Sequence, residues 1–206
     1  MDEYFTSFLN DFGPAICTQK VPASSIERYR GKLPDQLLSY WQEYGWSGYA
    51  AGLFWTINPE EYEPVLEAWI GETPFMENDA YHIIARSAFG DLFVFGEQDD
   101  KQLHIIAPDS QMMPPREVVT TDLNLSIRAF FGTMSPDACD FSDVNGNQLF
   151  ESTLKKLGML KEDEMYGFVP ALALGGPATL GHLQKVKAVE HLVFLAQLAP
   201  LTIMSY

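Results

Sequence analysis

The middle of the chain constrains the fold most strongly, because three short apolar segments follow one another there with only tight turns between them. Residues 81–88 read YHIIARSA, residues 92–97 read LFVFGE, and residues 102–108 read QLHIIAP. All three are rich in β-branched and aromatic side chains, and Gly90 and the polar run 98–101 separate them. Connections this short join antiparallel neighbours. The sequence therefore predicts an antiparallel meander at the centre of the fold.

Helical patterns lie on both sides of this meander. Apolar residues recur at helical spacing in residues 2–11 and 34–44 before it, and in residues 122–132, 148–157 and about 186–199 after it. This order predicts an α+β fold, in which helices flank a central and mainly antiparallel sheet and a smaller, mostly helical C-terminal domain follows.

A polar stretch marks the expected joint between the two parts. Residues 132–147 read GTMSPDACDFSDVNGN and are rich in Pro, Asp, Ser and Gly, as linkers are. We therefore expect an α+β domain at residues 1–135 and a C-terminal domain at residues 136–206, which can pack as one unit with the first.

Charge limits the kind of partner. The chain has 28 acidic residues against 13 basic ones, a formal net charge of −15. Such a chain repels phosphate backbones, which argues against a nucleic acid as direct partner, and it attracts a basic protein surface. Plain solubility is the alternative explanation. The acids form three runs, at 60–63, 97–100 and 162–164, and each lies beside an aromatic or aliphatic residue.

Two of these runs supply our first candidates for partner contact. Glu60, Glu61 and Glu63 begin a predicted helix, and Asp99 and Asp100 lie in a turn of the meander. Each is a solvated surface group if no partner binds. If one does, these carboxylates would steer a basic protein towards this surface.

Two aromatic residues are candidate anchors beside the acids. Residues 45–52 read GWSGYAAG, which predicts a glycine-punctuated loop. We expect Trp46 and Tyr49 to lie exposed in that loop, where aromatic side chains anchor protein interfaces. Core packing is the expected use of most of the other aromatic residues nearby.

The sequence shows no set of residues typical of catalysis, cofactor binding or a metal site. The four histidines form neither an H-E-x-x-H pair nor a Cys/His zinc spacing. A calcium-like run has Phe141 where an acid is needed and Ser152 where a glutamate is needed. A nucleophile elbow of the G-x-S-x-G type is absent from the sequence. We therefore expect a binding protein without cofactor or metal.

The ends of the chain and its cysteines favour a cytoplasmic location. The N-terminus begins with acids and has no apolar core of a secretion signal. The longest apolar run, near residues 189–201, is interrupted by polar residues and Pro200, so we expect no membrane span. Cys17 and Cys139 are expected to remain free thiols in such a compartment.

A glycine pair suggests an alternative function. Residues 166–186 read YGFVPALALGGPATLGHLQKV, in which an apolar run, two glycines and a helix pattern follow in the order of a phosphate-binding loop. Neither G-x-x-x-x-G-K-[ST] nor G-x-G-x-x-G occurs, and Pro177 lacks the N–H that a phosphate cradle uses. A bent strand and tight turn are therefore favoured. The alternative is a small-molecule or nucleotide-binding regulatory module that uses Gly175, Gly176 and the loop at 45–52.

Several stretches resemble known bacterial families. Residues 33–71 read LPDQLLSYWQEYGWSGYAAGLFWTINPEEYEPVLEAWIG and resemble the GAD-like domain, and residues 89–97, FGDLFVFGE, fit the sheet that follows in that family. Residues 165–198, from MYGFVPALALGG to LQKVKAVEHLVFLAQL, resemble the C-terminal domain of type VI secretion immunity proteins that neutralise DNase effectors.

The resemblance implies a cytoplasmic protein that binds a cognate toxin, a basic nuclease, and blocks it. It also implies that the protein is not an enzyme, because the family offers no catalytic residues to carry over. The surplus of acids agrees with such a partner, since a nuclease is basic where it holds DNA. An adaptor for some other protein differs from this hypothesis only in the partner.

Overall fold

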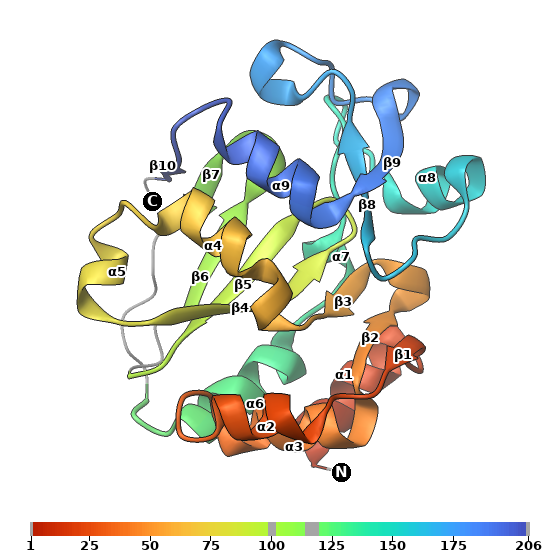
Figure 1. The fold of residues 1–206 in the computed structure, drawn as a ribbon. Coiled ribbons are helices and arrows are strands. Elements are labelled where there is room, and N and C mark those ends of the chain that lie inside the picture. The colour runs from red at the N-terminus through yellow and green to blue at the C-terminus, as the bar shows by residue number, and fades with distance from the viewer. Residues whose placement is uncertain (1, 99–101, 114–119, 205–206) are drawn as a thin grey trace.

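A computed structural model of the chain describes residues 2–98, 102–113 and 120–204. These residues form an eight-stranded sheet, a separate two-stranded sheet, and helices that lie against both faces of the larger sheet (Figure 1). The predicted α+β class, with a mainly antiparallel sheet at its centre, is confirmed.

The large sheet follows the chain almost in order. Its strands, from one edge to the other, are β1 (Ile16–Gln19), β2 (Trp46–Tyr49), β3 (Phe54–Thr56), β4 (Tyr81–Ser87), β5 (Asp91–Gly96), β6 (Gln102–Ile106), β7 (Gln111–Met113) and β10 (Thr202–Ile203). Each pair is antiparallel except the last, in which β10 runs parallel to β7. The predicted meander is strands β4 to β6, with β7 continuing it.

Helices cover the sheet from two sides (Figure 1). Before the meander they are α1 (Glu3–Phe12), α2 (Ala23–Tyr29), α3 (Asp35–Tyr44), α4 (Glu63–Ile70) and α5 (Phe75–Asn78). After it they are α6 (Leu123–Thr133), α7 (Pro136–Cys139), α8 (Phe150–Leu157) and α9 (Ala188–Ala196). Short 3-10 turns are η1 (Ala50–Gly52), η2 (Pro59–Tyr62), η3 (Ala107–Asp109), η4 (Leu172–Leu174) and η5 (Leu180–His182).

Aromatic rings form the core between the sheet and helices α1 and α6. Phe8 of α1 lies 5.5 Å from Phe54 of β3 and 5.3 Å from Phe131 of α6, measured between ring centroids. All three side chains are buried, as are their aromatic neighbours Phe5 and Tyr49. Edge-to-face contacts of this kind stabilise beyond the area they bury. The apolar residues that recur at helical spacing in residues 2–11 therefore form the face of α1 that packs against the sheet.

The C-terminal part contacts the rest of the fold through α9 and through a second sheet, made of β8 (Glu164–Phe168) and β9 (Leu183–Lys187). Tyr166 N donates to the carbonyl of Ala88 at 2.8 Å, and the indole of Trp69 donates to the carbonyl of Leu192 at 3.1 Å. We call this contact, of β8 with the turn after β4 and of α9 with α4, the seam. The proposed boundary at residue 135 stays a prediction.

The seam requires a glycine at position 90. Its φ is +102°, and a Cβ there would lie 2.6 Å from Met165 Cε and 3.2 Å from Leu192 Cδ2. Any other residue would be strained by this backbone conformation, and its Cβ would force the Met165 and Leu192 side chains to shift.

Candidate functional site

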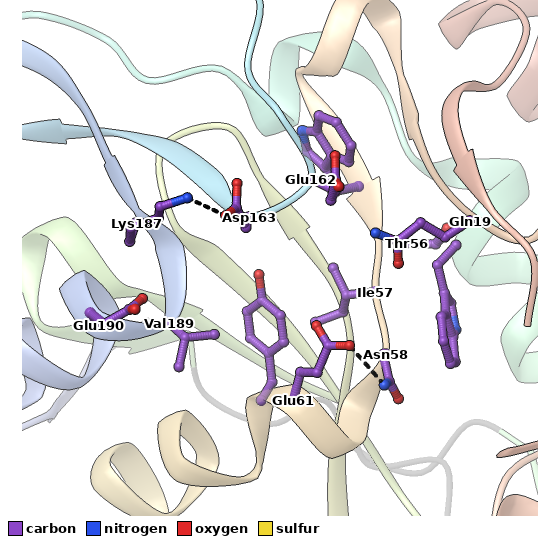
Figure 2. A pocket seen from close by; sticks show the side chains of 13 residues that line it. Gln19, Thr56, Ile57, Asn58, Glu61, Glu162, Asp163, Lys187, Val189 and Glu190 are labelled. Atoms are coloured by element: carbon purple, nitrogen blue, oxygen red, sulfur yellow. Dashed lines mark hydrogen bonds and ion pairs between the residues drawn. The ribbon is translucent and has the colours of Figure 1, made fainter.

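A cleft of about 350 Å3 opens along the seam, between the large sheet and the turn before β8 (Figure 2). Buried side chains from β2, β3, η2 and the segment between β3 and η2 line it: Trp46, Trp55, Ile57 and Tyr62. Exposed carboxylates surround it: Glu61, Glu162, Asp163 and Glu190. We call this the acidic cleft. Its lining comes from both parts of the chain, so it exists only when the two are packed together.

A helix cap fixes Glu61 at the cleft. Asn58 is the N-cap residue of η2, and its side-chain oxygen accepts a hydrogen bond from the backbone N–H of Glu60 at 3.3 Å. The amide nitrogen of the same Asn58 donates to Glu61 Oε1 at 3.1 Å. Asparagine is a favoured capping residue because its short side chain reaches the first free N–H groups. A neutral amide thus orients Glu61 without cancelling its charge.

Buried Arg86 of β4 holds the acidic turn of the C-terminal part in place. Its Nη2 donates to the carbonyls of Glu162 at 2.9 Å and Glu164 at 2.8 Å. Its Nε donates to the hydroxyl of Tyr62 at 2.8 Å, and its Cζ lies 5.3 Å from the ring centroid of Trp55. A guanidinium suits this role because its fixed fork of donors reaches several oxygens while its plane contacts a ring. The arginine takes backbone oxygens here, so the Glu162 and Glu164 carboxylates stay free of it.

Tyr62 remains a neutral phenol beside the cleft. Burial raises its pKa above the usual value for tyrosine, and the nearby charge of Arg86 offsets only part of that effect. The hydroxyl therefore accepts from Arg86 as a protonated group at physiological pH.

The charges around the cleft do not cancel. Lys187 pairs with Asp163, and its hydrogen bond lowers the pKa of that carboxyl. Among the described residues neither Glu162 nor Glu190 has an ion pair. Figure 2 shows Glu61, Glu162 and Glu190 reaching the cleft from three separate segments of the chain. The cleft keeps a negative field, even with Lys187 at its edge and Arg86 beneath it.

The structure separates the three glutamates that the sequence grouped together. Glu60 Oε1 accepts from Arg28 Nη1 at 2.8 Å, and Glu63 Oε1 accepts from Arg28 Nη2 at 3.0 Å. Only Glu61 lines the cleft. Adjacent positions on a short helix point in different directions, so one run of acids supplies two different environments.

The prediction that Trp46 and Tyr49 lie in an exposed loop is wrong. Residues 46–49 form strand β2, and the two side chains are 6% and 0% exposed. Gly48 faces the ring of Trp55, which allows the strand to pack closely there. A glycine that suggested a loop in the sequence therefore lies in a strand, where it leaves room for a bulky side chain of the neighbouring strand. Trp46 nevertheless lines the cleft.

Asp99 and Asp100 lie outside the described residues. Glu162 and Asp163 belong to an acidic run that the sequence shows plainly. Glu190 has no such signal, because it is an isolated acid in the first turn of α9. Arg86 is a single basic residue inside an apolar strand, and a buried charge of that kind is the signal that marks a structural or functional joint.

The Gly175-Gly176 turn uses its own backbone donors. Gly175 N donates to the carbonyl of Leu172 at 2.8 Å, and Gly176 N donates to the carbonyl of Ala171 at 3.1 Å. Gly175 adopts the left-handed conformation, and a Cβ on Gly176 would collide with the carbonyl of Pro170. Both glycines are needed for a tight turn, and the N–H groups that would hold a phosphate are already occupied.

Other sequence features have structural uses as well. Asp143 accepts from the backbone N–H groups of Asn145 and Asn147, which closes a local turn. Cys17 is exposed, Cys139 is buried, and both are free thiols. Within residues 2–98, 102–113 and 120–204, no three His, Cys, Asp or Glu side chains are placed to hold a metal ion. None of the helices in the described segments combines the length and apolar character needed to span a bilayer.

Comparison with known proteins assigns both parts of the chain. Residues 3–109 match the GAD-like domain, and residues 125–199 match the C-terminal region of the type VI secretion system (T6SS) immunity protein Tdi1. No curated protein matches the chain. The crystal structure of Atu4351 from Agrobacterium tumefaciens is similar, with a TM-score of 0.81 and 23% sequence identity over 94% of this chain and 88% of that one.

The similarity to Atu4351 shows a shared fold that extends over both parts. The two family matches fall in the order that the sequence resemblance predicts, and the acidic cleft lies between them. The chain belongs to the GAD-like domain family, and its C-terminal region is that of a T6SS immunity protein.

Proposed function

We propose that this immunity protein binds a cognate secreted nuclease in the cytoplasm and covers the basic surface on which that nuclease holds DNA. Binding, rather than catalysis, is the proposed mode of action. The acidic cleft and the surface around it form the proposed contact region.

The overall charge supports such a partner. A net charge of −15 accelerates the encounter with a basic protein, and the effect weakens as salt increases. Nucleases need basic surfaces because DNA carries a dense negative charge. An inhibitor that presents carboxylates to that surface competes with the phosphates for the same cationic groups.

The observation that carries the proposal is the group of carboxylates at the cleft that have no cationic partner among the described residues. Glu61, Glu162 and Glu190 stand exposed around a concave surface with aromatic side chains in its wall. Interfaces gain affinity from buried aromatic and charged anchors, and charges that are already paired contribute little. We assign Glu60 and Glu63 a peripheral role for that reason.

The remaining sequence candidates keep separate roles in the proposal. Contact through Asp99 and Asp100 stays a prediction. Trp46 and Tyr49 are buried, so we propose that they shape the contact surface from beneath.

Co-expression with the cognate effector tests this function. We expect the wild-type protein to protect cells from the effector and to purify with it as a stable complex. The double reversal E162K/E190K should reduce protection, because it places two cations where the toxin's own cations would bind. E72K/E77K is the matched control, since both positions are exposed and remote from the cleft lining.

Two results would argue against the proposal. One is a wild-type protein that neither protects cells nor binds the effector. The other is an effector that hydrolyses no nucleic acid, which would remove the nuclease assignment and leave the immunity role.

A further inference from the structure

We propose that the acidic cleft is a receptor for one arginine side chain of the partner protein, together with a neighbouring main-chain carbonyl. This inference rests on the proposed function and specifies what the cleft binds. The cleft volume of about 350 Å3 lies in the range of sites that enclose small ligands. It therefore has room for a long side chain.

The carboxylates indicate a cation that is larger than a metal ion. Glu61, Glu162 and Glu190 come from three separate segments of the chain. These three carboxylates are not placed to coordinate one metal ion together. The same is true of every group of three His, Cys, Asp or Glu side chains in the described residues. Carboxylates that are spread around a cavity suit a planar guanidinium, whose five N–H donors point in several directions.

Trp46 provides a second and independent indication. It is 6% exposed, it lines the cleft, and its indole N–H has no hydrogen-bond acceptor among the described residues. The neighbouring Trp55, by contrast, donates to the carbonyl of Gly52 at 2.8 Å. A buried donor without an acceptor is costly. The Nε1 atom is itself buried, so a ligand that brings a carbonyl with its cation would satisfy it only as the cleft wall opens around it, which points to a residue within a peptide chain.

The same wall already binds one guanidinium from its inner side. Arg86 contacts the ring of Trp55 and donates to the hydroxyl of Tyr62 and to the carbonyl of Glu162. Aromatic faces and oxygen acceptors thus occur here in a combination that suits arginine better than lysine. The positive charges of Arg86 and Lys187 oppose a second cation, but they are fewer than the carboxylates that surround the cleft.

A peptide titration tests the inference on the complete protein. The isotopically labelled chain is titrated with acetyl-Gly-Arg-Gly-amide, and NMR follows the indole N–H signal of Trp46 and the backbone signals of Glu61, Glu162 and Glu190. The control peptide carries citrulline, which has the shape of arginine and no charge. We expect saturable shifts with arginine and at least about tenfold weaker binding with citrulline.

Matched variants locate the binding site. E162Q/E190Q should weaken the arginine peptide about tenfold, whereas E72Q/E77Q, with the same change in charge far from the cleft, should bind as the wild type does. Equal responses to the arginine and citrulline peptides would overturn the inference. Equal binding to E162Q/E190Q and E72Q/E77Q would overturn it as well.

Binding of the cognate effector separates this inference from the proposed function. If the effector dissociates from E162Q/E190Q as slowly as from E72Q/E77Q, the cleft is not an arginine receptor although the immunity role stands. If the wild-type protein does not bind the effector, the proposed function is wrong, and the peptide titration still decides what the cleft binds.

Discussion

Two arginines hold two acidic segments of this protein in opposite ways. Buried Arg86 binds the backbone carbonyls of Glu162 and Glu164, and their carboxylates stay free of it. Exposed Arg28 binds the carboxylates of Glu60 and Glu63 themselves. The first arrangement organises an acidic turn and preserves its charge, whereas the second cancels much of the charge that it organises.

This difference explains why a count of acids does not locate the binding surface. The run at 60–63 has the higher density of glutamates in the sequence, but two of them already have a cationic partner. The turn at 162–163 and the isolated Glu190 contribute to a cleft that remains negative. Availability of charge, rather than its amount, distinguishes the two regions.

Replacing Arg86 with methionine should give the largest effect. The change removes the donor from three carbonyls, of Ser87, Glu162 and Glu164, and from the Tyr62 hydroxyl, and it releases the turn at 162–164 from the sheet. We expect a loss of about 3–5 kcal/mol in the free energy of unfolding, measured by urea denaturation. Arg86→Lys should recover only part of it, because a single ammonium cannot reproduce the fork. A loss below about 1 kcal/mol would contradict the role of Arg86 as the joint.

A buried acid that has no cationic partner in the described part of the chain extends the comparison. Asp91 is 6% exposed, and burial raises the pKa of its carboxyl to about 7, with a smaller contribution from Asp109 and an opposing hydrogen bond from Ser87. The folded state therefore holds a proton that the unfolded chain releases near pH 4. Its contribution to stability is complete below that pH and is lost as the pH rises towards 7.

The variant Asp91→Asn removes this dependence. Between pH 5.5 and pH 8 the wild type should lose on the order of 2 kcal/mol of unfolding free energy relative to the variant. Urea denaturation of both proteins at the two pH values measures the difference between their free energies of unfolding. The titration of other groups cancels in this difference because both proteins contain them. A constant difference across this range would show that Asp91 ionises at its usual pKa.

Replacing Arg28 with methionine should have the smallest effect on stability and a distinctive effect on binding. Its ion pairs are exposed, so we expect a loss below about 1 kcal/mol in the free energy of unfolding. The change frees the carboxylates of Glu60 and Glu63, and association with the effector should become about two- to threefold faster at low salt. Stopped-flow mixing measures the rate, and a slower association would mean that Arg28 itself contacts the partner.

Much of the fold could be predicted from the sequence because its elements follow local rules. The meander shows alternating apolar segments with tight turns, and α1 shows a clear apolar stripe. Strand β2 escaped prediction because Gly45 and Gly48 resemble loop residues. Their use depends on neighbours that are distant in the sequence, such as the carbonyl of Gln19 and the ring of Trp55.

The site was predictable only in part, for a similar reason. Glu61 was identified as an acid at a helix start, and the run at 162–164 was visible as charge. Their convergence depends on Arg86 and the packing of α9, which no local pattern specifies. Whether a carboxylate has a cationic partner, as Glu60 has in Arg28, is likewise a property of the folded chain alone.

The most direct test compares the association rates of two neutralised variants with the cognate effector. E162Q/E190Q and E60Q/E63Q remove the same number of charges, one pair at the cleft and one pair beside Arg28. Rates measured by stopped-flow mixing over a range of salt concentrations separate local charge from net charge, because both variants have the same net charge.

We expect E162Q/E190Q to associate about tenfold more slowly than the wild type at low salt, with a shallower dependence on salt. E60Q/E63Q should stay within about twofold of the wild type, since its glutamates are already paired. Equal slowing of the two variants, or a greater slowing of E60Q/E63Q, would contradict the claim that the unpaired carboxylates of the acidic cleft guide the partner.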